Sequence, residues 1–405
     1  MSLIQNLWKR FFPPVQPLPA GVYHCQMPST EQLPYRLHLR IEPDSSGILI
    51  INASTVVHLN QSAAEYAFHL VNGTDEDVAA AEIARRYAVK KEIVKRDYQD
   101  LISRLKTLVE TQDLDPVAFL DFERQTPYAS TGSAPYRIDC TLTYRLPSEG
   151  AAHLAPLDRV SRELTREEWQ MVLDKSWNAG VPHVLFTGGE PTLRPDLPQL
   201  ILHAEHLGMV AGLITDGLRL AEKKYLHELL QSGLDHVMLL LDPTEDQSWE
   251  ALRDTMAEDI AVTVHLTLTQ HNQPQVASIL DRLVSLEVKN LSQSADSPQL
   301  KDALDAAREA AAERQLRLVW DMPVPYSHFN PVALELQAEA GGEDAVPHGD
   351  GQAWIYVEPD GDVLTGQGHY RETLGNLLVD SFETVWQHRP QPVEGHTVGN
   401  ETQPE

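Results

Sequence analysis

Short strands and longer helices alternate between residues 136 and 320, and this alternation limits the fold more than any other feature of the chain. Apolar runs such as HVLFTG, VAGLIT and HVMLLLD are each followed by a longer segment whose apolar residues have helical spacing. Parallel strands need crossover connections of this length, and helices usually supply them. Thr165 and Glu168 also form the pattern of a capping box at the start of the first such helix. We therefore expect an α/β fold in which a mostly parallel sheet forms an open or closed barrel.

A different pattern precedes the barrel. Residues 35–59 alternate apolar and polar side chains in three short β-rich runs, and residues 61–109 contain three segments with helical spacing, the first ending near Gly73. These elements predict a small α+β domain of winged-helix size. Residues 111–135 end in small and turn-forming residues and are expected to be a linker between two folding units. Residues 1–34 are expected to be an N-terminal extension, either a short docking segment or a frayed terminus with a Pro-rich spacer.

The composition is that of an acidic globular protein. The 405 residues carry a formal net charge of −27 at pH 7, which argues against nucleic acid or an anionic membrane as a main partner because both need clustered Lys and Arg. The two cysteines, Cys25 and Cys140, cannot form a disulfide framework or an all-cysteine metal site. The start of the chain has no long apolar run, so we expect neither a signal peptide nor a transmembrane segment, and a cytoplasmic location.

The loop TGGEP, after the second barrel strand, is the first candidate ligand site. Functional residues of α/β folds lie at the carboxyl ends of the strands, where this loop is expected. Two residues without Cβ atoms would let a ligand approach the backbone N–H groups, and the carboxylate of Glu190 suits an ammonium group. A structural turn that leaves the strand is the alternative interpretation.

Three motifs in order resemble a known family. HVLFTGGEPTLRPDL, GMVAGLITDGLRL and GLDHVMLLLD are similar to successive motifs of radical S-adenosylmethionine (radical SAM) enzymes of the peptide-modifying, SPASM-containing kind. The C-terminal WIYVEPDGDV and LGNLLVDSFETVWQH resemble the SPASM segment, and the N-terminal domain resembles the PqqD-like fold, the RiPP recognition element that holds a precursor peptide. The resemblance implies a PqqD-like domain at 35–110, a linker at 111–135, a partial (β/α) barrel of the radical SAM type at 136–322, a SPASM-like segment at 323–390 and a flexible tail at 391–405.

The resemblance also implies two sets of binding residues. S-adenosylmethionine would be held at the strand ends, by Gly188, Gly189, Glu190, Pro191, Asp216 and Asp242. A leader or precursor peptide would join the exposed edge of the third strand, beside the last helix of the N-terminal domain. The residues that this implies are Thr55, Val56, Val57, His58, Leu59, Lys95, Leu101 and Leu105. Basic residues on that helix favour an acidic leader peptide, with a solvated helix face as the alternative.

The chain departs from the family pattern at the cluster ligands. The family carries C-x-x-x-C-x-x-C after the first barrel strand, because thiolates hold its iron–sulfur cluster. Aligning TYR in LTYRLPSEGAAH places Leu146, Gly150 and His153 at those positions, and Thr365 and Gly366 occupy the place of Pro-Cys in the SPASM-like segment. Asp216 also replaces the usual Asn, and Leu240 replaces Ser. We therefore expect the iron–sulfur cluster to be absent and no metal to be bound.

Three hypotheses about function stay open. The favoured one is a non-catalytic radical SAM-like protein, a pseudoenzyme that binds a precursor peptide or an intact maturation enzyme such as a radical SAM protein. The second is an enzyme that acts on S-adenosylmethionine or a peptide without a cluster, through Glu190, Asp216, Asp242 and His153. The third is an iron–sulfur enzyme whose ligands come from another chain. Glu190 either still binds S-adenosylmethionine or serves the loop alone, by capping the next helix or pairing with Arg194.

Overall fold

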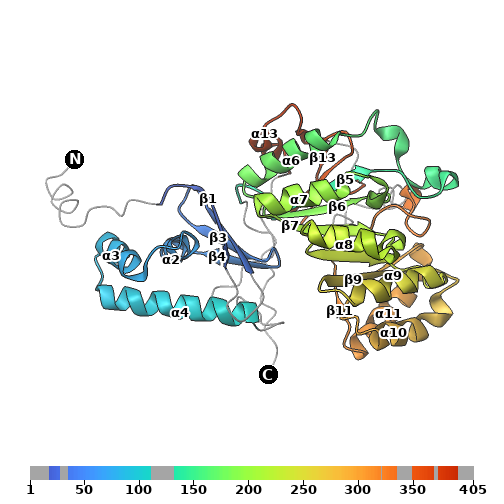
Figure 1. Cartoon of the computed structure of the whole chain (residues 1–405), viewed down its shortest axis with the longest axis horizontal. Coiled ribbons are helices and arrows are strands. Elements are labelled where there is room, and N and C mark those ends of the chain that lie inside the picture. Colours follow the sequence, from blue (N-terminus) through green and yellow to red (C-terminus); the bar gives the residue numbers. More distant parts are fainter. Residues whose placement is uncertain are drawn as a thin grey trace, which may run out of the picture.

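The computed structural model describes residues 18–27, 35–110, 132–320, 322–334, 349–368 and 373–390. Most of the expected N-terminal extension, nearly all of the linker and the whole tail at 391–405 lie outside these ranges. Figure 1 shows a smaller N-terminal domain beside a larger α/β domain. Within the described ranges, no helix has the length and apolar character needed to cross a membrane.

The N-terminal domain has one strand more than the sequence predicts. Its antiparallel sheet has the order β1-β2-β3-β4, formed by β1 (Gly21–Met27), β2 (Tyr35–Ile41), β3 (Gly47–Ile51) and β4 (Thr55–Leu59). Three helices follow as expected, namely α2 (Gln61–Val71), α3 (Glu76–Tyr87) and α4 (Lys91–Glu110). The expectation that residues 1–34 lie outside the domain is corrected, because β1 pairs with β2 along its whole length.

Local signals explain the start and end of the first helix. The side chain of Asn60 accepts a hydrogen bond from the N–H of Ala63 at 2.9 Å and caps the N-terminus of α2. The helix ends at Val71, and Gly73 follows with a φ of 60°, the left-handed conformation that glycine tolerates best. The predicted stop at Gly73 is therefore confirmed.

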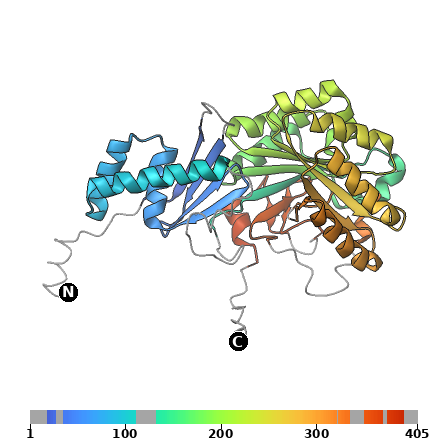
Figure 2. The same ribbon diagram turned by 90° about the horizontal axis from the view of Figure 1, so that it is seen from below.

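The expected α/β architecture of the second domain is confirmed. Parallel strands alternate with helices around one curved sheet (Figure 2). The strands are β5 (Arg137–Thr143), β6 (His183–Gly188), β7 (Val210–Thr215), β8 (His236–Leu240), β9 (Ala261–Leu268), β10 (Asn290–Ala295) and β11 (Arg317–Leu318). The helices are α6 (Arg166–Asn178), α7 (Leu197–Leu207), α8 (Lys223–Gln231), α9 (Asp246–Met256), α10 (Val276–Ser285) and α11 (Lys301–Glu313). Helix α6 begins with the predicted capping box of Thr165 and Glu168.

The C-terminal segment extends the same sheet instead of forming a separate layer. Strand β12 (Trp354–Val357) pairs in parallel with β5, and β13 (Asp362–Leu364) and β14 (Gly375–Asn376) continue the sheet antiparallel. The sheet has ten strands in the order β11-β10-β9-β8-β7-β6-β5-β12-β13-β14. Helix α13 (Phe382–Gln387) closes the described chain. The boundary at residue 322 that the sequence suggests therefore does not separate two sheets.

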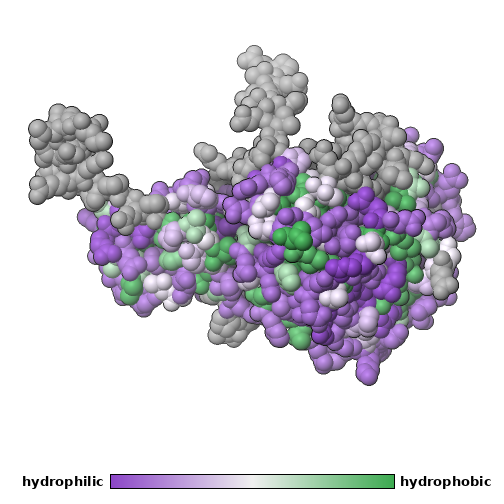
Figure 3. Space-filling view, turned by 90° about the horizontal axis from the view of Figure 1, so that it is seen from above, coloured by the Kyte–Doolittle hydropathy of each residue, from purple (hydrophilic) through white to green (hydrophobic). Residues whose placement is uncertain are grey.

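The two faces of the large sheet differ in chemistry. Alternate residues on the helix side, such as Cys140, Phe186 and Leu213, belong to one large apolar core. The opposite, inner face carries buried polar side chains, among them the ion pair of Arg137 with Asp139. Outside the core, hydrophilic residues dominate the face of the molecule in Figure 3, and hydrophobic ones form separate patches there. Any ligand site of the barrel is therefore sought at the inner face and the strand ends.

The two domains are packed together through the second face of the small sheet. One face of this sheet packs on its own helices, while the alternating polar residues of β2 face the large domain. His38 and Arg40 are only 4% and 1% exposed. Nη1 of Arg36 donates to Oδ2 of Asp235 at 2.8 Å, and Nε2 of His38 donates to the carbonyl oxygen of Gly180 at 2.9 Å. The linker thus does not leave the two folding units apart.

Candidate functional site

The two glycines of the TGGEP loop pack against the backbone that follows β5. A Cβ atom at Gly188 would lie 2.2 Å from the carbonyl oxygen of Thr143, and one at Gly189 would lie 2.3 Å from that of Arg145. The N–H groups of Gly189 and Glu190 donate to these same two carbonyls at 2.8 Å. The space that the glycines leave is therefore filled by the neighbouring loop, and these N–H groups already have partners.

Glu190 is 2% exposed, and its carboxylate accepts three hydrogen bonds. Oε1 accepts from the N–H of Thr192 at 2.8 Å and from the hydroxyl of Thr215 at 2.9 Å, and Oε2 accepts from the N–H of Asp216 at 2.8 Å. Glu190 thus caps the 3-10 helix Pro191–Leu193 and joins the end of β6 to the end of β7. Burial, and then the charge of Asp216, raise the pKa of Glu190 to about 8.

Arg194 is not the partner of Glu190. Its guanidinium binds Asp196, with Nη2 to Oδ2 at 2.7 Å, and Nη1 donates to the carbonyl oxygen of Leu164 at 3.0 Å. Of the two structural roles expected for Glu190, capping is the one found. The alternative, a pair with Arg194, is wrong.

The structure brings Asp216 close to Glu190 and leaves Asp242 in a turn of its own. Oδ1 of Asp216 accepts from the N–H of Leu218 at 2.9 Å, and burial raises the pKa of this carboxyl. Oδ1 of Asp242 accepts from the N–H of Thr244 at 2.9 Å, and Nε2 of His328 lies 3.6 Å from its Oδ2. The carboxylates at these strand ends therefore mainly organise their own loops.

The candidate peptide-binding residues divide between core and surface. Within the described residues, β4 pairs only with β3, so its other edge is unpaired. Val57, Leu59 and Leu105 lie in the core between the sheet and its helices, and Leu101 lies half-buried beside it. The remaining three residues of β4, which are Thr55, Val56 and His58, are half-buried.

Four of the five basic residues of α4 form ion pairs within the domain. The Nζ atoms of Lys91 and Lys95 lie 2.8 and 2.7 Å from Oδ1 of Asp77. Nη2 of Arg96 lies 3.1 Å from Oδ1 of Asp97, and Nε of Arg104 lies 2.8 Å from Oδ2 of Asp100. The charge that suggested an acidic leader peptide is thus partly compensated within the domain.

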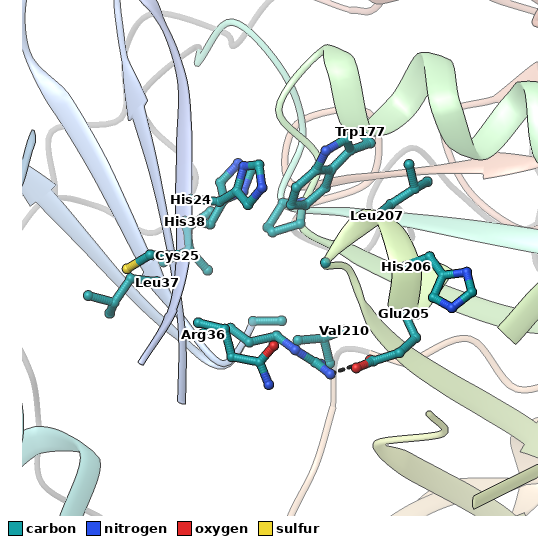
Figure 4. A pocket seen from close by; sticks show the side chains of 15 residues that line it. His24, Cys25, Arg36, Leu37, His38, Trp177, Glu205, His206, Leu207 and Val210 are labelled. Atoms are coloured by element: carbon teal, nitrogen blue, oxygen red, sulfur yellow. Dashed lines mark hydrogen bonds and ion pairs between the residues drawn. The ribbon is translucent and has the colours of Figure 1, made fainter. Parts of the chain in front are cut away.

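A cleft between the domains is a feature that sequence reasoning missed. It has a volume of about 220 Å³ and lies between strands β1 and β2 and the ends of α6 and α7. His24 and His38 turn toward Trp177 there, with ring centroids 4.7 and 5.3 Å from the indole, and Arg36 binds Glu205 (Figure 4). The only sequence signal was the alternation of basic residues along β2, which is equally typical of an exposed strand face.

Comparison with known proteins places the chain in a family. The family model described as Radical SAM superfamily matches residues 143–260. A PqqA peptide cyclase from Streptomyces rochei is 30% identical over 285 residues, which cover 62% of this chain and 76% of that protein. One from Bradyrhizobium diazoefficiens is 30% identical over 301 residues, with 66% and 76% covered. The chain belongs to the radical SAM superfamily.

Solved structures of the radical SAM superfamily have the same fold over most of the chain. The crystal structure of Streptococcus suis SuiB covers 88% of this chain and 87% of that one, with a TM-score of 0.57 and 14% identity. SuiB bound to precursor peptide SuiA matches with the same TM-score and identity, over 91% of this chain and 89% of that one. At this identity the likeness concerns the fold.

The radical SAM cluster positions do not offer a ligand set in this chain. Leu146 is half-buried and packs in an apolar cluster with Tyr144, while Gly150 and His153 are exposed on the 3-10 helix Glu149–Leu154. Cys140 is fully buried on the helix side of β5. Among the residues that the structure describes, no three His, Cys, Asp or Glu side chains are grouped to hold a metal ion. The residues present at the first cluster position therefore do not fit an iron–sulfur cluster.

Gly366, which the sequence aligns with a cysteine of the SPASM segment, is closed in by packing. Gly366 is buried, and a Cβ atom there would lie 1.9 Å from Oδ2 of Asp350. Asp350 in turn accepts a hydrogen bond from Nε1 of Trp354. A side chain any larger than glycine would need this carboxylate to move, so the position has no room for a thiolate ligand as the loop now stands.

Proposed function

We propose that this radical SAM protein is a non-catalytic partner in the maturation of a ribosomally made peptide, in the cytoplasm. Its N-terminal domain acts as a PqqD-like recognition element that binds the precursor or leader peptide. The barrel and a SPASM-like C-terminal segment form the scaffold to which an intact maturation enzyme binds. The observation that carries the proposal is the edge of β4 that no described strand pairs with, because an extended peptide can add to such an edge as a further strand.

The relatives support peptide as the class of ligand. Two of them are named PqqA peptide cyclases, and the SuiB fold has been solved with its precursor peptide SuiA. The non-catalytic part of the proposal is supported by the chemistry of Leu146, Gly150 and His153, since one imidazole cannot hold a four-iron cluster.

Binding of S-adenosylmethionine is not part of the proposal. The carboxylate of Glu190, which would receive the ammonium group of the cofactor, already accepts three hydrogen bonds inside the protein. A carboxylate can accept about four hydrogen bonds, so at most one site is left for a ligand, on a side chain that is only 2% exposed. This observation weighs against the alternative, an S-adenosylmethionine-binding enzyme with cluster-free or partner-supplied iron–sulfur chemistry.

The contacts of the N-terminal domain also bear on the kind of peptide that we propose. Because four of the five cations of α4 are paired with Asp77, Asp97 or Asp100, we expect the long-range attraction for an acidic peptide to be weak. Recognition then rests on backbone hydrogen bonds along β4 and on apolar contact with half-buried side chains such as Leu101. We therefore propose a β-forming leader with alternate apolar residues, and expect its affinity to change little with salt.

The test uses the full chain and a candidate precursor peptide, taken from a short reading frame beside its gene. Two synthetic versions of that peptide carry N-methyl groups on odd or on even residues of the binding segment, which removes alternate N–H donors without changing side chains. Strand addition predicts that one series loses binding by at least about tenfold and that the other binds normally, because alternate N–H groups face the partner strand. Equal binding of both series would contradict the proposal.

A matched pair of protein variants tests the apolar contact. Leu101→Gln should weaken binding by about tenfold, which corresponds to about 1.4 kcal/mol. Ile93→Gln changes a residue on the same helix that is 42% exposed and lies outside the core cluster beneath the sheet. It should leave the affinity unchanged. Equal effects of the two substitutions would rule out a contact at Leu101.

A further inference from the structure

Residues 322–332, which we call the strap, lie against the inner face of the barrel sheet. Met322 and Val324 pack on inward-facing side chains of three neighbouring strands. These are Leu185 of β6, Ile214 of β7, and Met238 and Leu240 of β8. The apolar part of the inner face is thereby covered by the chain itself.

The other end of the strap packs on the loop that replaces the cluster-binding loop. Tyr326 lies with its ring centroid 5.7 Å from that of Tyr144, edge to face, and both rings are 1% exposed. Val332 joins the same apolar cluster, in which Leu146, the first family ligand position, also packs. The other residues of this cluster come from the 3-10 helices and the turns beside them, and they are Ala155, Leu157 and Val160.

Hydrogen bonds fix both sides of this arrangement. The carbonyl oxygen of Val324 accepts from Nδ2 of Asn330 and from Nε2 of Gln367, each at 2.8 Å. On the other side of the loop, Glu358 is 2% exposed and accepts from the hydroxyl of Tyr144 and from Nε of Arg159, again at 2.8 Å each. The strap and Glu358, the residue after β12, therefore both hold the loop.

We propose that the strap is an internal occupant of the barrel mouth, which orders residues 146–160 by apolar packing where family members would use metal ligation. Leucine at position 146 suits this role because it contributes apolar surface to the cluster that Tyr326 and Val332 complete. Since the strap covers the inner residues of β6, β7 and β8, a ligand can reach them only after the strap has left. This inference stands independently of peptide binding by the N-terminal domain.

Amide hydrogen exchange on the full chain tests the proposal. Tyr326→Ala should accelerate exchange in residues 146–160 by at least about tenfold, because the opening free energy of a segment follows the packing that holds it. Helices α2 and α7, which lie outside this cluster, should keep their protection. The control His328→Ala changes an exposed residue of the same strap, outside the apolar cluster, and should leave residues 146–160 unchanged.

Two outcomes would overturn the proposal. One is unchanged exchange of residues 146–160 in folded Tyr326→Ala. If this variant loses protection everywhere, the milder Val332→Ala, at the rim of the same cluster, decides the question by the same readout. The other is saturation of the wild-type chain by S-adenosylmethionine while residues 322–332 keep full protection, because that would show the inner face to be accessible beneath the strap.

Discussion

At the scale of single residues, Gly189 and Gly150 mark opposite environments within one small region. A Cβ atom at Gly189 would lie 2.3 and 2.8 Å from the carbonyl oxygens of Arg145 and Tyr144, which are backbone atoms and cannot rotate away. At Gly150 the nearest atom, the Oγ of Ser148, would be 3.6 Å away. The first glycine is required by packing, and the second is not.

We expect Gly189→Ala to lower the free energy of unfolding by about 1–3 kcal/mol, as forced overpacking does. Gly150→Ala should change it by less than about 0.5 kcal/mol, as surface substitutions usually do. Urea unfolding of both variants measures the difference. A neutral Gly189→Ala would mean that the loop after β5 can move aside, which would reopen the backbone to a ligand.

Glu190 predicts a pH dependence of stability with a definite sign. Its pKa is raised from 4.5 to about 8, so between these values the folded protein holds a proton that the unfolded chain has lost. The free energy of unfolding should therefore fall as pH rises through this window, by up to about 1.4 kcal/mol per pH unit. Glu190→Gln cannot titrate and should lose this slope.

Urea unfolding of wild type and Glu190→Gln at pH 5, 6.5 and 8 checks this sign. The stability advantage of wild type over the variant should shrink as pH rises, because only wild type loses the stabilising proton. A constant difference would mean that the three hydrogen-bond donors keep the carboxylate ionised throughout.

At the scale of elements, strand β2 has two buried faces. Leu39 packs in the core beneath α2 and α4, whereas Arg40 on the opposite face is 1% exposed against the large domain. Its Nε binds Oε1 of Glu42 at 2.9 Å. Arg40→Gln should therefore lower the free energy of unfolding by about 1.5–3 kcal/mol, the range for hydrogen bonds to charged groups.

The matched control for Arg40 is Arg96→Gln. The side chain of Arg96 is 76% exposed, and among the residues that the structure describes it binds only its neighbour Asp97. This substitution should change the free energy of unfolding by less than about 0.5 kcal/mol. Thermal or urea unfolding compares the two variants. Equally small effects would mean that water reaches the face of β2 that lies toward the barrel.

Strand β2 also shows what could and could not be predicted from the sequence. The alternation in YRLHLRI predicted the strand correctly, because periodicity reports which side chains share a face. It could not tell that a second domain covers the polar face, since that contact comes from residues such as Gly180 and Asp235, far along the chain. Strand β1 was missed because its short run follows a Pro-rich stretch, and its pairing with β2 is a tertiary event.

The location of the candidate site could be predicted from the sequence, but the contacts and hydrogen bonds of its residues could not. The motif order located TGGEP at the end of a parallel strand, where the structure has it. Two contacts depend on the relative position of neighbouring strands: the glycines meet the carbonyls of Thr143 and Arg145, and Glu190 bonds the end of β7 as well as its own loop. Periodicity and spacing carry no information about such contacts.

At the scale of the whole molecule, Arg36 joins the two domains. Its guanidinium reaches from β2 to Glu205 and Asp235, and the latter also accepts from the N–H of Ala211. We expect Arg36→Met to split thermal unfolding into two transitions and to increase the radius of gyration in solution scattering. The control Arg104→Met removes an exposed ion pair within α4, and it should change neither the number of unfolding transitions nor the radius of gyration. A single cooperative transition in Arg36→Met would mean that the contacts of Trp177 and of the buried face of β2 are enough to hold the two domains together.

The small sheet is packed between its own helices and the barrel, and this fixes where a bound peptide would start on its way to a modifying enzyme. A peptide added to β4 would leave the protein from a fixed starting point, and its free part could sample only the sphere that its own length allows. An extended chain spans at most about 3.3–3.6 Å per residue, so ten residues beyond the bound segment reach roughly 35 Å. The number of residues between the bound segment and the modified position would then set the largest distance at which the active site of the modifying enzyme could lie from β4.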